Sequence, residues 1–388
     1  MKIGNVRNYR VIIDNYDVTD ATIGCKIFHD IQSPTWSAQV FFLDTANLIN
    51  TLPILSGSKI KIMFETKNGS SLDMKQEFEF VIYRVGDKDM QNQQALLYTA
   101  FAVAPDFVKN LSTRISRNFK NTKMTDSIRS IVSDTFENMT VNGIACDNNA
   151  NLIIPNWTPF NSIGWMMKMA HINSRADFLF FQTEKNEYTL DSILNCFSKL
   201  ASSEVLKIRP ANLRMEIPND VFNIFEYEFK HSDASANMAS GYYGNTLKTF
   251  DFRKKEWDVQ EYKTSEVKNW KGSDFENASN SVVNFKAKSF GVNGEGISPS
   301  DDANIWLQSR MASLMNMEQE KLIVKIPGGV GIYKWLGKTI NVDLPSQNTV
   351  SKNTIDEKRS GRYLVTAIVH NFERQTYSNT LELVRRSL

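Results

Sequence analysis

The first 105 residues contain six short runs of β-branched and aromatic residues, separated by turn-forming stretches such as KNGSS and GDKD. Glycine, asparagine and aspartate in these stretches favour chain reversals. Short strands at this spacing are typical of a small antiparallel barrel or sandwich. The predicted strands are YRVIID at 9–14, CKIFHD at 25–30, AQVFFLD at 38–44, SKIKIMF at 58–64, FEFVIYRV at 78–85 and ALLYTAFAV at 95–103.

The apolar period then changes from two residues to between three and four. Residues 125–138 place apolar side chains on one helical face, and Thr125 is the expected N-cap. Residues 158–171 show the same period, with Thr158 as the expected N-cap. Pro159 follows at the first helical position, where proline is favoured. The pattern therefore predicts two helices, unlike anything in the first 105 residues.

Strand patterns return after these helices. Residues 176–193 predict a hairpin that turns near Lys185–Asn186, and further strands are expected at 212–217 and 221–231. A polar, irregular region follows, and a helix opened by Ser300 or Asp301 is then expected. The last strands are KLIVKIP at 321–327, KTINVDL at 338–344 and the closing hairpin at 363–385.

Two distant β regions look alike. SGSKIKIMF at 56–64 aligns with LGKTINVDL at 336–344, and each is followed by a pair of strands. Either the chain contains a structural duplication, or two small β domains share a common pattern. A duplication would leave the second copy interrupted by residues 232–320.

These patterns predict an α+β protein that is mainly β, with two antiparallel β-barrel domains and inserted α+β segments. The expected divisions are 1–105 for the first β domain, 106–208 for an α+β segment, 209–231 plus 321–388 for the interrupted second β domain, and 232–320 for an inserted loop and helix region.

Composition indicates a folded protein without a strong electrostatic signature. Of 388 residues, 41% are hydrophobic and 23% are charged, and the formal net charge is only +2. No run of Lys and Arg reaches five residues, so wrapping of a duplex and polybasic membrane binding are not expected. The apolar runs are too short for a membrane helix, and three widely spaced cysteines indicate reduced thiols.

The sequence shows no recognisable catalytic, cofactor or metal site. Four histidines are scattered singly, and no cysteine stands beside a histidine in a nucleophile motif. GVNGEG at 291–296 lacks the strand and helix of a phosphate-binding loop. His370 shares a strand face with Leu364, Ile368 and Phe372, which predicts a buried wall histidine. We therefore expect neither an enzyme nor a bound cofactor.

Aromatic residues instead suggest assembly. Tyrosine and tryptophan are enriched at the buried centres of protein interfaces. Several fall in or near residues 232–320 and before the last strands: Tyr242, Tyr243, Trp257, Trp270, Trp306, Tyr333 and Trp335. The residues chosen as interface candidates are Tyr242, Tyr243, Trp270, Tyr333 and Trp335.

The order of these parts resembles a known family. The helix start P-x-x-T-P-F-x-x-I at 155–163, the hairpin FLFFQTEKNEYTLDSI and the ending from GRYLVTAIVHNF to YSNTLELVR are similar to the baseplate hub protein of T-even-type contractile phages. The wider family includes the late control gene D protein and the N-terminal part of VgrG spike proteins. The resemblance spans nearly the whole chain.

The resemblance implies a structural protein of the virion. Family members carry two barrels of the tail-tube type and form homotrimers, so six barrels make a pseudo-sixfold ring around the DNA channel. The expected partners are further copies of the chain, a trimeric spike protein, tail tube or tube-initiator proteins and baseplate wedge proteins. DNA would pass only in transit during genome ejection. Membrane insertion is not expected, and assembly would occur in the host cytoplasm. Because the chain stops directly after its last strand, a spike or lysozyme would be a separate polypeptide.

Two alternatives remain open at this point. The chain could be a glycan- or receptor-binding β protein of the tail tip, with exposed aromatic residues as stacking surfaces. It could also be a tail-associated cell-wall hydrolase, which would need a carboxylate or Cys/His site.

Overall fold

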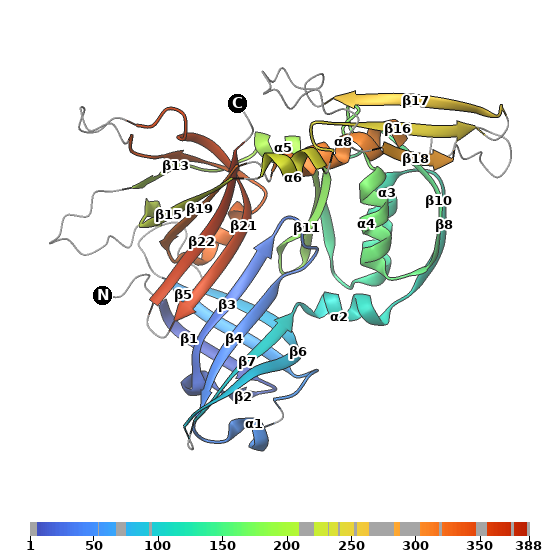
Figure 1. Cartoon of the computed structure of the whole chain (residues 1–388). Coiled ribbons are helices and arrows are strands. Elements are labelled where there is room, and N and C mark those ends of the chain that lie inside the picture. The colour runs from blue at the N-terminus through green and yellow to red at the C-terminus, as the bar shows by residue number, and fades with distance from the viewer. Residues whose placement is uncertain are drawn as a thin grey trace.

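The computed structural model of the chain is mainly β, with helices gathered beside one part of the sheet (Figure 1). It describes residues 6–52, 54–66, 75–92, 95–208, 221–231, 233–239, 241–251, 254–263, 283–287, 303–317, 320–346, 355–373 and 376–385. The strand predicted at 212–217 and the helix caps Ser300 and Asp301 lie outside these ranges.

The first β unit comprises seven strands, and all six strands predicted for this region are present. They pair in the order β3-β4-β7-β6-β5-β1-β2. Short helical turns η1 (Thr19–Ala21) and α1 (Leu48–Thr51) join some of them. The strands are β1 (Val6–Ile13), β2 (Tyr16–Asp17), β3 (Thr22–Asp30), β4 (Ser37–Asp44), β5 (Lys59–Thr66), β6 (Lys75–Asn92) and β7 (Ala95–Val103).

Strict alternation explains how this unit buries one face. Side chains of β4 alternate between half-buried and buried along the whole strand, and Val40 and Phe42 are fully buried. Because successive residues of a strand point to opposite faces, one face supplies the core. We call this the first core. It receives Val330, Tyr333, Phe372 and Tyr377 from the far end of the sequence.

The α+β segment follows the first unit. Its second long helix begins at Pro159 with Thr158 as N-cap, as predicted, although the side chain of Asn110, rather than that of Thr158, accepts from the backbone N–H of Phe160 at 2.7 Å. Thr125 as an N-cap was wrong, because the preceding helix begins one residue earlier. The elements are α2 (Pro105–Ser112), β8 (Ile115–Lys123), α3 (Met124–Thr135), β9 (Thr140–Gly143), β10 (Asn149–Trp157), α4 (Pro159–Met169), β11 (Phe178–Glu184) and β12 (Glu187–Ser192).

Strand β11 separates two cores. Its sequence FLFF is apolar on both faces, as expected of a strand buried on both sides. Phe178 and Phe180 pack into the core of the α+β segment, whereas Leu179 and Phe181 pack into a different core. The predicted hairpin turn at Lys185–Asn186 joins β11 to β12.

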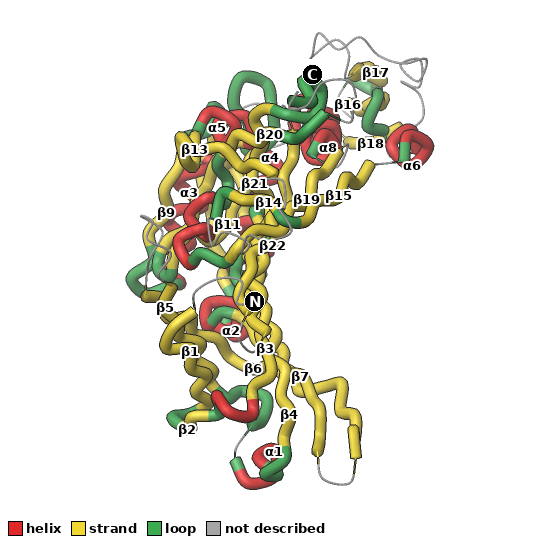
Figure 2. Tube along the Cα trace, turned by 90° about the vertical axis from the view of Figure 1, so that its left-hand side faces the viewer, coloured by secondary structure: helices red, strands yellow, loops and turns green. Residues whose placement is uncertain are grey.

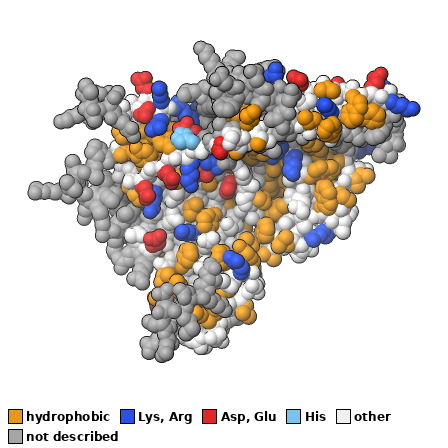
Figure 3. All heavy atoms as spheres, viewed as in Figure 1, with side chains coloured by type: hydrophobic (Ala, Val, Ile, Leu, Met, Phe, Trp, Pro, Cys, Tyr) orange, Lys and Arg blue, Asp and Glu red, His pale blue; other side chains and the backbone are white. Residues whose placement is uncertain are grey.

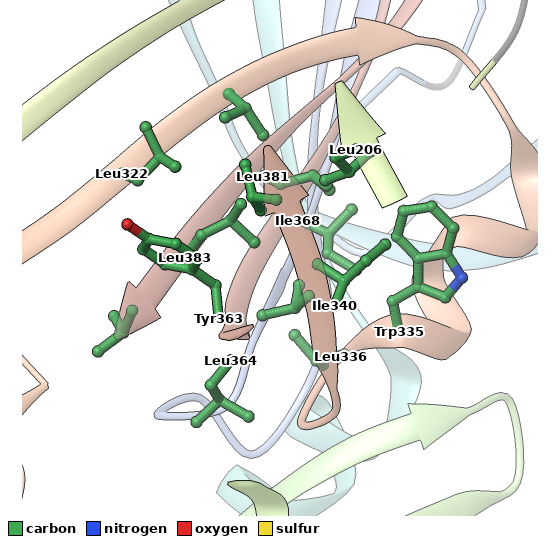
Figure 4. Close-up of a cluster of buried hydrophobic side chains, with 14 of the residues drawn as sticks. Leu206, Leu322, Trp335, Leu336, Ile340, Tyr363, Leu364, Ile368, Leu381 and Leu383 are labelled. Atoms are coloured by element: carbon green, nitrogen blue, oxygen red, sulfur yellow. The ribbon is translucent and has the colours of Figure 1, made fainter. Parts of the chain in front are cut away.

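The second β unit surrounds that other core, which we call the second core (Figure 4). Leu206, Leu322, Ile340 and Leu383 point into it from four different strands. The elements are α5 (Ile193–Ser198), β13 (Leu200–Ile208), β14 (Asn223–Ile224), β15 (Glu226–His231), β19 (Glu320–Pro327), η3 (Val330–Trp335), β20 (Thr339–Asp343), β21 (Gly361–Glu373) and β22 (Thr376–Arg385). β13 pairs with β20, although its residues fall within the predicted 106–208 segment. The division boundaries stay a prediction.

The inserted region leaves and returns at one place. His231 at the end of β15 pairs with Glu320 at the start of β19, so the second β unit is left and rejoined at paired residues. Within it a three-stranded sheet in the order β17-β16-β18 lies over a helix at the top of the molecule in Figure 1. Its described elements are α6 (Ala234–Ala239), β16 (Gly244–Asp251), β17 (Glu256–Lys263), β18 (Val283–Ala287) and α8 (Ala303–Asn316).

The two β units form one branched sheet in which the described strands do not close into a barrel. Strand pairing runs continuously from β14 to β2, with β22, β19 and β15 branching from β21. The units follow one another along the length of the molecule (Figure 2). The two predicted closed barrels are therefore not found. The local order of antiparallel strands is nevertheless the same in β5-β6-β7 and β20-β21-β22, the elements that the sequence alignment matched.

Candidate functional site

The closing hairpin joins the two β units. One edge of β21 pairs with β20 through Gly361–Leu364 and then with β3 through Ala367–Glu373. The register shift between Val365 and Ala367 marks a bulge at the changeover. β22 pairs along nearly all of β21 on the other edge. A single hairpin therefore belongs to both units and holds them in one sheet.

Two histidines lie where the first core meets the second. His29 of β3 and His370 of β21 are fully buried, and their ring centroids are 5.0 Å apart in an edge-to-face arrangement. Each lies between a residue of the first core and a residue of the second core, both two positions away along the chain. These flanking residues are Ile27 and Phe372 on the first side, and Ile31 and Ile368 on the second.

Hydrogen bonds fix the orientation of His370. The backbone N–H of Gly329 donates to Oδ1 of Asn379 at 2.7 Å, so Nδ2 of Asn379 faces the imidazole and donates to Nδ1 at 2.8 Å. The Tyr377 hydroxyl lies 2.7 Å from the same nitrogen. Nδ1 therefore accepts, and the neutral ring carries its proton on Nε2. Burial lowers the pKa of His370 to about 3.

His29 sits in an aromatic environment. Its ring centroid lies 4.6 Å from the ring of Trp36, 5.8 Å from Phe78 and 6.1 Å from Tyr333. Neither ring nitrogen has a hydrogen-bond partner among the described residues. Burial, and secondarily the neighbouring His370, hold the pKa of His29 well below its usual value. Both rings therefore favour the neutral form because the site does not solvate a cation.

The α+β segment meets the same junction. Nε1 of Trp36 donates to the backbone oxygen of Gln182 at 3.0 Å, and the backbone N–H of Trp36 donates to Oε1 of Gln182 at 3.3 Å. Gln182 belongs to β11, so the strand that separates two cores also contacts the residue that covers His29. Three parts of the chain thus converge on the histidine pair.

An exposed apolar face lies on the inserted sheet. Trp257 and Phe285 are 60% and 69% exposed, and their rings meet at 6.3 Å in an edge-to-face arrangement. Val259 and Val283 are exposed on the same strands, and Nζ of Lys248 lies 5.9 Å from the ring centroid of Phe285. Figure 3 shows hydrophobic side chains gathered over this sheet. We call these five residues the aromatic face.

The opposite face of this sheet is anchored to the α+β segment by α8. Nη1 of Arg310 donates to the backbone oxygens of Met167 at 3.3 Å and Phe178 at 3.1 Å. The hydroxyl of Ser309 accepts from the backbone N–H of Ala176 at 3.2 Å. Burial lowers the pKa of Arg310 to about 10. The aromatic face is therefore held on a support fixed to the rest of the chain.

The predicted interface residues are located within the chain. Tyr242 and Tyr243 form a small buried cluster with Tyr262, while Tyr333 lies in the first core and Trp335 in the second. Trp270 falls outside the described residues. Their participation in a subunit interface stays a prediction. Among the described residues of the inserted region, the exposed aromatic side chains are Trp257 and Phe285.

The described residues offer little chemistry. No group of three or more His, Cys, Asp and Glu side chains within the described ranges is placed to hold a metal ion. The three cysteines are free and buried, and burial raises the pKa of Cys25 to about 12. A buried thiol with a raised pKa is a poor nucleophile. No helix of the described ranges is long and apolar enough to cross a membrane.

Sequence reasoning missed the histidine pair. His29 and His370 are 341 positions apart, and only the pairing of β3 with β21 brings them together. His370 was expected on a buried strand face, and it lies there. Its partner carried no signal in the sequence, because strand pairing at this separation leaves no periodicity.

Comparisons with known proteins identify the fold. No protein-family model matches the sequence, and no curated protein matches it. Solved structures do match. The tail protein from Neisseria meningitidis MC58 aligns with a TM-score of 0.58 and 11% identity over 98% of this chain and 97% of that chain. The 43 kDa tail protein of prophage MuSo2 from Shewanella oneidensis also has a TM-score of 0.58 and 11% identity, over 97% of this chain and 98% of that chain. The chain therefore shares the fold of these tail proteins along its whole length.

Proposed function

We propose that the chain is a structural protein of a contractile phage tail, namely the hub of its baseplate. The observation that carries the proposal is the full-length likeness to two tail proteins. Three copies of the chain form a ring around the DNA channel. One face of the ring binds a trimeric spike, and the other face binds tail tube or tube-initiator proteins. Wedge proteins surround the ring.

The shared hairpin suits this role. Because β21 and β22 belong to both β units, the two units keep a fixed relation within one chain. Three chains would then present six similarly oriented β units, which is the arrangement that a hexameric tube needs at its end. A formal net charge of +2 is compatible with a conduit, since a strongly basic channel would retain DNA through its phosphates.

The aromatic face favours a second candidate, a glycan-binding protein of the tail tip. Exposed Trp257 and Phe285 could stack on sugar rings. Such a protein would bind a glycan array as a monomer, and Trp257→Ala would remove that signal. The hub would give no such signal.

The solution mass tests the hub proposal. Light scattering across a concentration series should give about 133 kDa for the chain alone, three times the 44.3 kDa of one chain, and a larger mass once spike protein is added. A chain that stays at 44.3 kDa and binds neither spike nor tube protein would contradict it.

A further inference from the structure

The junction between the two cores depends on two neutral histidines. His29 and His370 face one another at 5.0 Å, and both side chains are sealed from solvent. Burying a charge without a counter-charge costs far more free energy than burying a neutral polar group. The junction can therefore hold neutral imidazole rings, but it does not stabilise a charged imidazolium.

The described residues around the pair supply no compensating charge. β6 contributes Phe78, the residues before β4 contribute Trp36, η3 contributes Tyr333, and β22 contributes Tyr377 and Asn379. The titratable groups among these neighbours are the two tyrosines. More distant carboxylates, Glu184 and Glu187, act on Tyr333, and the Cys25 thiol acts on Tyr377. No carboxylate among the described residues contacts either imidazole.

Protonation of His370 at Nδ1 would also break the hydrogen bond that it accepts from Asn379. Nδ1 of His370 accepts from Asn379, whose own orientation is fixed by the backbone N–H of Gly329. A proton on Nδ1 would turn this acceptor into a donor that faces the NH₂ group of Asn379, and the Tyr377 hydroxyl, 2.7 Å away, would be the acceptor left for it. A proton on His29 would place a cation 5.0 Å from a second ring that must then stay neutral.

We propose that the His29–His370 pair is an acid-sensitive latch between the two β units. At neutral pH the uncharged rings let the first core continue into the second across β3 and β21. Protonation of either ring requires water to enter, and this separates β3 from β21 and frees the two units to move apart. The latch lies within one chain, so it stands or falls independently of the proposed hub function.

The sign of the pH effect follows from linkage. Both histidines have a lower pKa in the folded chain than the ordinary value of 6.5, so the unfolded chain binds more protons. Stability is complete above about pH 6.5, falls as the pH decreases, and continues to fall to about pH 3 for His370. At pH 5 each histidine should raise the opening constant about 30-fold relative to pH 8, and the pair about 1,000-fold.

His29→Leu provides the test, because it removes a titratable ring that makes no hydrogen bond. The opening constant of this variant is measured from hydrogen exchange of residues 24–30 and 367–373. Between pH 8 and pH 5 it should rise about 30-fold less than the opening constant of wild type. His29→Phe serves as a second variant if leucine packs poorly. His231→Gln, at an exposed histidine outside the junction, should retain the wild-type pH dependence.

Residues 124–135 of the α+β segment provide the internal reference. In wild type, protection of the junction strands should fall at pH 5 while protection of this helix persists. A His29→Leu profile parallel to wild type would overturn the proposal. So would a wild-type loss of protection at pH 5 that is equal at the junction and in the reference helix.

Discussion

Shortening a buried side chain at either end of the closing hairpin should destabilise both β units. Phe372 lies in the first core, where its ring stacks on Tyr377 at 4.3 Å and meets Phe64 at 4.3 Å. Leu383 is fully buried in the second core and pairs with Val365 and Leu322. Phe372→Ala should cost about 3–5 kcal/mol and Leu383→Ala about 2–5 kcal/mol, because each leaves a cavity in a packed core.

Both substitutions act on one continuous hairpin, so their effects should not stay local. We expect each variant to weaken the hydrogen-exchange protection of residues 78–82 in β6 and of residues 322–326 in β19. A loss of about 3 kcal/mol corresponds to roughly two orders of magnitude in protection. Phe119→Ala, in the core of the α+β segment, provides the matched control and should affect its own segment more than either strand.

Independent units would behave differently. Phe372→Ala would then reduce protection of β6 alone, and Leu383→Ala would reduce protection of β19 alone. That outcome would refute the inference that the shared hairpin makes the two units cooperative, even if both variants lost the expected total stability.

Three further substitutions test local packing. Gly337 has φ +70°, and a Cβ there would lie 2.6 Å from the Phe181 ring, so Gly337→Ala should lower the unfolding free energy by about 1–3 kcal/mol. Gly164→Ala, with open space in a helix, should instead raise it by about 0.5–1 kcal/mol; urea unfolding compares the two. Arg310→Met leaves two backbone oxygens unpaired, including that of Phe178, and should speed hydrogen exchange in α8 by about tenfold or more. Unchanged exchange would show that α8 is anchored elsewhere.

Local patterns were sufficient to predict many of the elements. Alternation in AQVFFLD and the continuous apolar run FLFF gave strands at their observed places, and Pro159 marked the start of α4. These signals come from residues that lie close together in the sequence, and such residues determine the apolar period, the helix caps and the turns. The Thr125 cap failed because the chain stays extended only to Lys123, a boundary that helix periodicity does not fix to one residue.

Long-range pairing could not be predicted in the same way. β3 pairs with β21 from the far end of the sequence, so the first unit shares an edge with the second and the described strands do not close into the two expected barrels. Burial also depends on these contacts. The sequence marks Tyr333 and Trp335 only as aromatic residues, and the structure places one in the first core and the other in the second. Trp257 carries the same sequence signal and is exposed.

The most direct test of the hub proposal is electron microscopy of the purified chain bound to its spike protein. Averaged end views should show a threefold ring with six similar β densities around an open channel. A particle without threefold symmetry, or one whose centre is closed by this chain, would contradict the proposal.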